Sequence, residues 1–115
     1  MLIEVKGRNC VVTDELHALV ERRFRRVANQ VAEVARMEVE LTEERNPAIA
    51  RPHVAEVTLY LKGTTLRVHE ASYDMPHAVN LCAEELSRQV KRHRDKRRHR
   101  RDARAVREDP VRPAA

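Results

Sequence analysis

The sequence predicts an α+β fold whose elements follow the order strand, helix, strand, strand, strand, helix. Four segments alternate apolar and polar residues, which is the two-residue period of a half-buried strand. Two other segments carry apolar residues at spacings of three and four, which is the period of an amphipathic helix. Because each element has one apolar side, the simplest packing is a four-stranded mixed sheet with both helices packed on one face.

The first strand and the first helix lie within residues 1–32. Ile3 and Val5 alternate with charged residues and predict a half-buried strand. Thr13 precedes two acidic residues and is a typical helix start, because its hydroxyl caps free N–H groups. The apolar stripe of this helix, which we expect to run to about residue 32, consists of Leu16, Val20, Phe24, Val27 and Val31. A right-handed crossover then makes the first and second strands parallel.

Three further strands are predicted at residues 37–42, 55–62 and 66–70, where apolar and polar residues alternate. Residues 43–52 contain two prolines and predict a long loop, whereas Gly63 predicts a tight turn with a positive φ. Hairpin connections make these strands antiparallel. The residues expected to face water on the uncovered side of the sheet are Glu38, Glu40, Glu56 and Thr58.

The second helix is predicted to begin near residues 72–74 and to run to about Arg101. Its stripe consists of Met75, Val79, Cys82, Leu86, Val90 and His93. The apolar stripe stops near Val90 while good helix formers continue, so the last turns should project beyond the sheet. We therefore expect one folded domain at residues 1–101 and a disordered tail or linker at residues 102–115.

Positive charge is concentrated at the C-terminal end of the chain. Residues 1–86 hold 11 Lys/Arg and 14 Asp/Glu, a net charge of −3, whereas residues 87–115 hold 12 and 4, a net charge of +8. Nine of these cations lie between Arg88 and Arg101, with one acidic residue among them. Cations packed along one helix repel each other, and a polyanion relieves that repulsion. A merely solvated extension normally mixes signs, so the pattern favours nucleic-acid binding.

Other function classes find little support in the sequence. Three aromatic residues and no tryptophan argue against recognition of single strands by base stacking. There is no zinc-ligand spacing, glycine-rich phosphate loop or nucleophile motif, so we expect no metal, cofactor, small-molecule substrate or enzymatic activity. No segment is long and apolar enough to span a membrane, and residues 1–9 lack the charged-then-apolar layout of a signal peptide. Cys10 and Cys82 are expected to fill the core in a reducing cytoplasm.

Four segments, in order along the chain, resemble those of the ribosome hibernation promoting factors, a bacterial family of ribosome-associated inhibitors. They are GRN at 7–9, VTDEL at 12–16, GTTLRVHEASYDM at 63–75 and ELSRQVKRHRDK at 85–96. The resemblance implies a fold similar in shape to double-stranded RNA-binding domains. It further implies cytoplasmic binding to rRNA of the small ribosomal subunit near the decoding centre, which blocks mRNA and tRNA and so inhibits translation.

Cations on both helices and on two strands form the predicted rRNA-binding site. The resemblance marks Arg8, Arg67, Asp74, Met75, Arg88, Gln89, Lys91 and Arg92. The full set of predicted rRNA-binding residues is Arg8, Arg22, Arg26, Arg67, Arg88, Lys91, Arg92, Arg94, Lys96, Arg97 and Arg98. The arginines of the first helix also have a simpler interpretation, which is surface pairing with Glu21 and Glu33.

Three alternatives stay open from the sequence. The chain could be a generic double-stranded RNA-binding domain without ribosome specificity, or an interaction module that dimerises through an exposed strand edge. It could also be a short-type family member or the N-terminal part of a long one. Longer members carry a C-terminal dimerisation domain, so a homodimer is expected only if such a domain is missing from this sequence. The helix entry YDMPHAVN departs from the family pattern at Tyr73, Pro76, His77 and Asn80.

Overall fold

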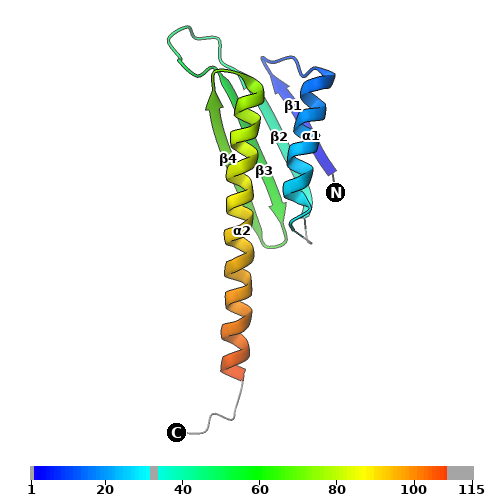
Figure 1. Ribbon diagram of the computed structural model, residues 1–115, viewed down its shortest axis with the longest axis vertical. Coiled ribbons are helices and arrows are strands. Elements are labelled where there is room, and N and C mark those ends of the chain that lie inside the picture. Colours follow the sequence, from blue (N-terminus) through cyan, green and yellow to red (C-terminus); the bar gives the residue numbers. More distant parts are fainter. Residues whose placement is uncertain (1, 32–33, 109–115) are drawn as a thin grey trace.

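The computed structural model describes residues 2–31 and 34–108. Its elements are β1 (Leu2–Arg8), α1 (Asp14–Ala28), β2 (Val34–Glu43), β3 (His53–Leu61), β4 (Thr64–Ser72) and α2 (Met75–Glu108). The sheet has the order β1-β2-β3-β4, with β1 parallel to β2 and the other pairs antiparallel. Figure 1 shows both helices on one face of this sheet. The predicted fold class and strand directions are therefore confirmed.

The hydrophobic core lies between the sheet and the two helices. The strand registers form apolar rows across the sheet, one of which places Val5 opposite Val39, then Val57, then Val68. Buried helix residues that cover these rows are Val20, Phe24 and Val27 on α1, and Met75, Val79, Cys82, Leu86 and Val90 on α2. Full burial of one such side chain contributes about 1.5–3 kcal/mol, so these stripes hold the helices against the sheet.

Helix α1 is shorter than predicted, because it ends at Ala28 and not near residue 32. The N–H of Gln30 bonds the carbonyl of Val27 at 3.0 Å, and that of Val31 bonds the carbonyl of Ala28 at 3.1 Å. These three-residue spacings tighten the chain after the helix and satisfy carbonyls that would otherwise lack partners. Val31 still packs against the core, so its predicted burial was right although its predicted helical state was wrong.

Helix α2 extends far beyond the sheet, as predicted, and is longer than predicted. It has 34 residues, about 50 Å at 1.5 Å per residue. Among the side chains of α2 that the structure describes, the last buried one is Val90. The predicted end near Arg101 was wrong, because the helix continues through residues 102–108, which we had expected in the tail. Residues 109–115 of that tail lie outside the described chain. The molecule measures 68 × 30 × 18 Å, and the overhang of α2 accounts for its length (Figure 1).

The uncovered face of the sheet is less uniformly acidic and less exposed than predicted. Thr58 is only 6% exposed, so its predicted contact with water was wrong. The register places Glu38 and Arg67 directly opposite it on the neighbouring strands, where these longer side chains flank it. Arg36 lies 4.4 Å above the Tyr60 ring and 3.2 Å from Glu38, and the Tyr60 hydroxyl donates to Glu38 at 3.2 Å. Cationic side chains thus balance part of this face.

Candidate nucleic-acid interface

One hydrogen bond joins α1 to α2, and a second joins the turn after α1 to α2. Arg23 Nε donates to Asn80 Oδ1 at 2.7 Å, and Gln30 Nε2 donates to Ser87 Oγ at 3.3 Å. A shallow groove of about 220 Å³ lies between the helices, and Arg26 contributes to its wall together with Arg23 and Ser87. Asn80 therefore connects the two helices.

Cations of α2 continue the line of this groove onto the overhang. Glu84 and Ser87 both line the groove. Lys91, Arg94 and Arg98 follow them at spacings of four, three and four residues, which places all five on one stripe of the helix. All three cations are exposed, and they lie beyond Val90 or next to it, where the core ends. The stripe therefore offers a row of cations about one helical turn apart.

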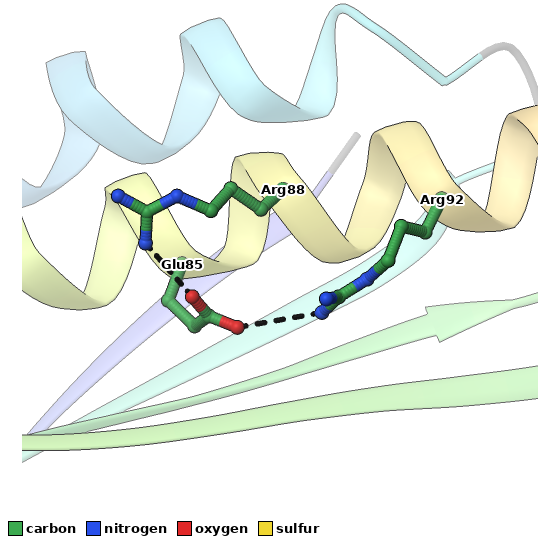
Figure 2. Close-up of polar contacts among 3 residues, drawn as sticks. All are labelled: Glu85, Arg88 and Arg92. Atoms are coloured by element: carbon green, nitrogen blue, oxygen red, sulfur yellow. Dashed lines mark hydrogen bonds and ion pairs between the residues drawn. The ribbon is translucent and has the colours of Figure 1, made fainter.

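Arg88 and Arg92 share one carboxylate on another side of α2. Figure 2 shows Glu85 between them, with Oε2 2.9 Å from Arg88 Nη1 and Oε1 3.4 Å from Arg92 Nη2. The hydrogen bond from Arg88 is the main cause that holds the pKa of Glu85 below its ordinary value. Both arginine side chains remain 65% exposed. One carboxylate cannot neutralise two guanidinium groups, so this triad keeps a net positive charge.

The four arginines of α1 lie in three different surroundings. Arg25 pairs with Glu21, as the simpler interpretation of this cluster predicted, whereas Glu33 lies outside the described residues. Arg22 and Arg26 are exposed. Arg23 is half-buried on the groove and was not among the predicted site residues. Its spacing from groove residues 26, 27 and 30 is the signal that could have identified it.

Two predicted site residues lie away from the helices. Arg8 and Arg67 are exposed on the uncovered face of the sheet, because the strand period turns them opposite to the core-facing residues. Arg8 lines a hollow there with Glu40 and Glu56. The structure thus brings the helical cations together but separates these two from them. Arg97 belongs to α2, although its side chain lies outside the described part.

The described residues contain no group of His, Cys, Asp or Glu side chains arranged to hold a metal ion. Within the same residues, no helix is long and apolar enough to cross a membrane. Cys10 and Cys82 are both free; Cys82 is buried as predicted, whereas Cys10 is only half-buried. What the helical face offers is a set of positive charges fixed on a rigid scaffold, which suits phosphate binding.

Comparison with known proteins identifies relatives along most of the chain. Residues 3–98 match the sequence model of a family described as Sigma 54 modulation protein / S30EA ribosomal protein. A ribosome hibernation promotion factor of Picosynechococcus sp. is 29% identical over 97 residues, which cover 84% of this chain and 50% of that protein. A ribosome hibernation promoting factor of Azotobacter vinelandii is 26% identical over 111 residues, 96% of this chain and 99% of that protein. The chain thus spans half of one relative and nearly all of the other.

Two solved structures share the fold. A ribosomal subunit interface protein from Coxiella burnetii superimposes with a TM-score of 0.72 at 20% identity, covering 83% of this chain and 99% of that one. The N-terminal domain of Thermus thermophilus Protein Y gives a TM-score of 0.69 at 29% identity, covering 81% and 99%. The arrangement of four strands and two helices is therefore one already known in experimental structures.

Proposed function

Because this chain belongs to the Sigma 54 modulation protein / S30EA ribosomal protein family, we propose that it is a ribosome hibernation factor. It inhibits translation by occupying a site on the ribosome. The names of its relatives in Picosynechococcus sp. and Azotobacter vinelandii support ribosome hibernation as its role. In this proposal it acts in the bacterial cytoplasm, without chemistry or a cofactor. Its face formed by α1 and α2 binds rRNA of the small subunit near the decoding centre and excludes mRNA and tRNA.

One observation carries the proposal, which is the alignment of α2 cations with the groove between the helices. Lys91, Arg94 and Arg98 extend the stripe by which α2 lines the groove, and Arg23 and Arg26 line the same groove from α1. Phosphates follow one another along an RNA backbone at regular intervals, so a row of fixed cations can neutralise several at once. Arginine suits this task because its planar guanidinium donates two parallel hydrogen bonds to a phosphate.

The Glu85 triad is compatible with the same role. Arg88 and Arg92 are bound to Glu85 in the free protein but stay largely exposed. Exposed ion pairs contribute only about 0–1 kcal/mol to stability, so a phosphate can replace Glu85 as the partner of either guanidinium at little cost in free energy. Arg8 and Arg67, on the other face of the sheet, contribute only where RNA reaches around a sheet edge, and we expect them to matter less than the helical cations.

Sedimentation with small ribosomal subunits tests the proposal. If about six to nine cations contact phosphates, the logarithm of affinity should fall against the logarithm of salt concentration with a slope of roughly −4 to −8. A variant with Arg88→Gln, Lys91→Gln and Arg92→Gln should lose most of its binding. Its melting temperature should change little, because these side chains are exposed.

The matched control removes three exposed cations from elsewhere on the surface. Lys6→Gln, Arg45→Gln and Arg51→Gln give the same change of net charge and should keep most of the binding. Equal losses in both variants would show that only net charge matters and would contradict a helical interface. An excess of duplex RNA as competitor separates a ribosome-specific factor from a generic double-stranded RNA-binding domain, because only the generic domain should be displaced readily.

A further inference from the structure

The end of the molecule opposite to the overhang carries a hollow of about 420 Å³. It lies where both helices begin, at the upper end of the sheet in Figure 1. Its apolar walls come from the connection between β1 and α1, from the first turns of α1 and from the start of α2. Their apolar side chains are Val11, Leu16, Leu19, Met75 and Pro76. Val11 is 83% exposed, so the hollow has a large apolar rim in contact with water.

The charge of this hollow is opposite to that of the helical face. Glu15 and Glu43 line it, and among the described residues no lysine or arginine does. Arg51, which belongs to the same end of the molecule, lies 5.8 Å above the ring of Tyr73. Carboxylates in the wall repel phosphate, so the hollow does not extend the RNA-binding face. They attract lysine and arginine side chains.

The wall that presents Val11 is held by two backbone features. A side chain at Gly7 would press its Cβ into the carbonyl oxygen of Cys10, so only glycine lets the chain fold back this closely. Asn9 adopts a φ of +54°, a left-handed conformation that asparagine tolerates better than most residues. Cys10 and Glu43 both line the hollow, and partial burial, aided by the charge of Glu43, raises the pKa of the Cys10 thiol. A wall fixed in this way loses little freedom when a ligand binds.

We propose that this hollow binds a basic polypeptide segment of a partner protein. One apolar side chain of the segment enters between Leu16, Leu19 and Met75, and flanking lysines or arginines lie against Glu15 and Glu43. An uncharged apolar ligand would leave the carboxylates unused, and an acidic segment would be repelled by them. This inference does not depend on RNA binding, because the hollow and the helical cations lie at different ends of the fold.

A labelled peptide tests the proposal on the isolated full chain. The probe is fluorescein-labelled Lys-Arg-Leu-Phe-Arg-Lys, and binding is followed by fluorescence anisotropy. Two comparison peptides replace Leu-Phe by Ser-Ser or all four cations by Glu. We expect the probe to bind at least about tenfold more tightly than either comparison peptide, because one lacks the apolar side chains and the other lacks the cations. Amide chemical-shift changes should map to residues 10–19 and to Met75.

Variants assign the binding to this hollow. Glu15→Gln with Glu43→Gln should weaken the probe about two- to thirtyfold, the range for two exposed ion pairs. The matched control, Glu4→Gln with Glu40→Gln, changes the net charge equally on the uncovered sheet face and should bind normally. Val11→Ser removes apolar contact at an exposed position, so it keeps the fold and should weaken binding about fivefold.

Several results would overturn the proposal. These are equal binding of the three peptides, shift changes confined to α2 beyond Val90, or equal loss in the control variant. Sedimentation equilibrium could give another such result. If the wild-type chain is a dimer and Val11→Ser makes it a monomer, a second copy of this chain occupies the hollow. Because none of these measurements uses ribosomes or RNA, their failure leaves the proposed function standing, and loss of ribosome binding leaves this inference standing.

Discussion

Replacing Glu85 by glutamine should strengthen binding to the small ribosomal subunit. In the free protein this carboxylate lies 2.9 Å from Arg88 and 3.4 Å from Arg92, so it competes with phosphate for both. A phosphate held by either arginine would lie roughly 6 Å from the carboxylate, where the repulsion is about 0.7 kcal/mol in water and about twice that at an effective dielectric constant of about 40. Removing the charge should therefore tighten binding about three- to tenfold.

Sedimentation over a series of salt concentrations measures this gain. The gain should shrink as salt rises, because exposed charges are screened within about 8 Å at physiological ionic strength. Glu4→Gln is the control, since it removes one negative charge from an exposed position on the edge strand β1. Unchanged or weaker binding by the Glu85 variant would refute the role of Arg88 and Arg92, and an equal gain in the control would reduce the effect to net charge.

The same carboxylate predicts a pH dependence of folding stability. The pKa of Glu85 is lowered in the folded protein from an ordinary value of 4.5, mainly by the hydrogen bond from Arg88. A lowered pKa means that the ionised group stabilises the fold above pH 4.5 and that this contribution is lost as the pH falls through the folded pKa. Wild-type protein should thus melt slightly higher than the Glu85→Gln variant at pH 6, and the difference should vanish in acid.

The remaining predictions concern the fold. Gly7→Ala should lower the free energy of unfolding by about 1–3 kcal/mol, because the new Cβ would meet the Cys10 carbonyl. Gly63→Ala should lower it by about 1–2 kcal/mol, because Gly63 has a φ of +80°, although the space around it is open. Urea denaturation measures both. Leu86→Ala empties a fully buried site and should cost about 2–5 kcal/mol in the same assay. A thiol reagent should label Cys10 in the native protein but Cys82 only after unfolding, because burial raises the pKa of Cys82 to about 12; equal rates would contradict its burial.

The element order and the core were predictable because both depend on local patterns. Each strand alternates, and each helix carries one apolar stripe, so the sequence states which side of every element is buried. The ends of the helices were less predictable. Helix α1 stops at Ala28 through carbonyl bonds made by the next three residues, although the apolar spacing continues to Val31. Helix α2 continues past Arg101 to Glu108, where no apolar stripe marks its course.

The candidate site was predictable in its charge but not in its arrangement. The cluster of cations after Arg88 is visible in the sequence alone. The contact between Arg23 and Asn80 joins residues 57 positions apart, and it arises only when the two helices pack on one sheet face. The placement of Arg67 on the uncovered face follows from the alternation of β4, which the sequence shows, whereas its pairing with Thr58 on β3 follows from the strand register, which a motif match does not contain. Tertiary packing, and not residue type, decides which cations act together.

The length of α2 has a consequence for measurements of mass in solution. The radius of gyration is 18.6 Å, whereas a compact chain of about 100 residues has one near 13 Å. A monomer of 13.4 kDa with this shape tumbles and diffuses like a considerably heavier globule. Gel filtration will therefore report an inflated mass that resembles a dimer, and light scattering, which is insensitive to shape at this size, is the appropriate way to count subunits.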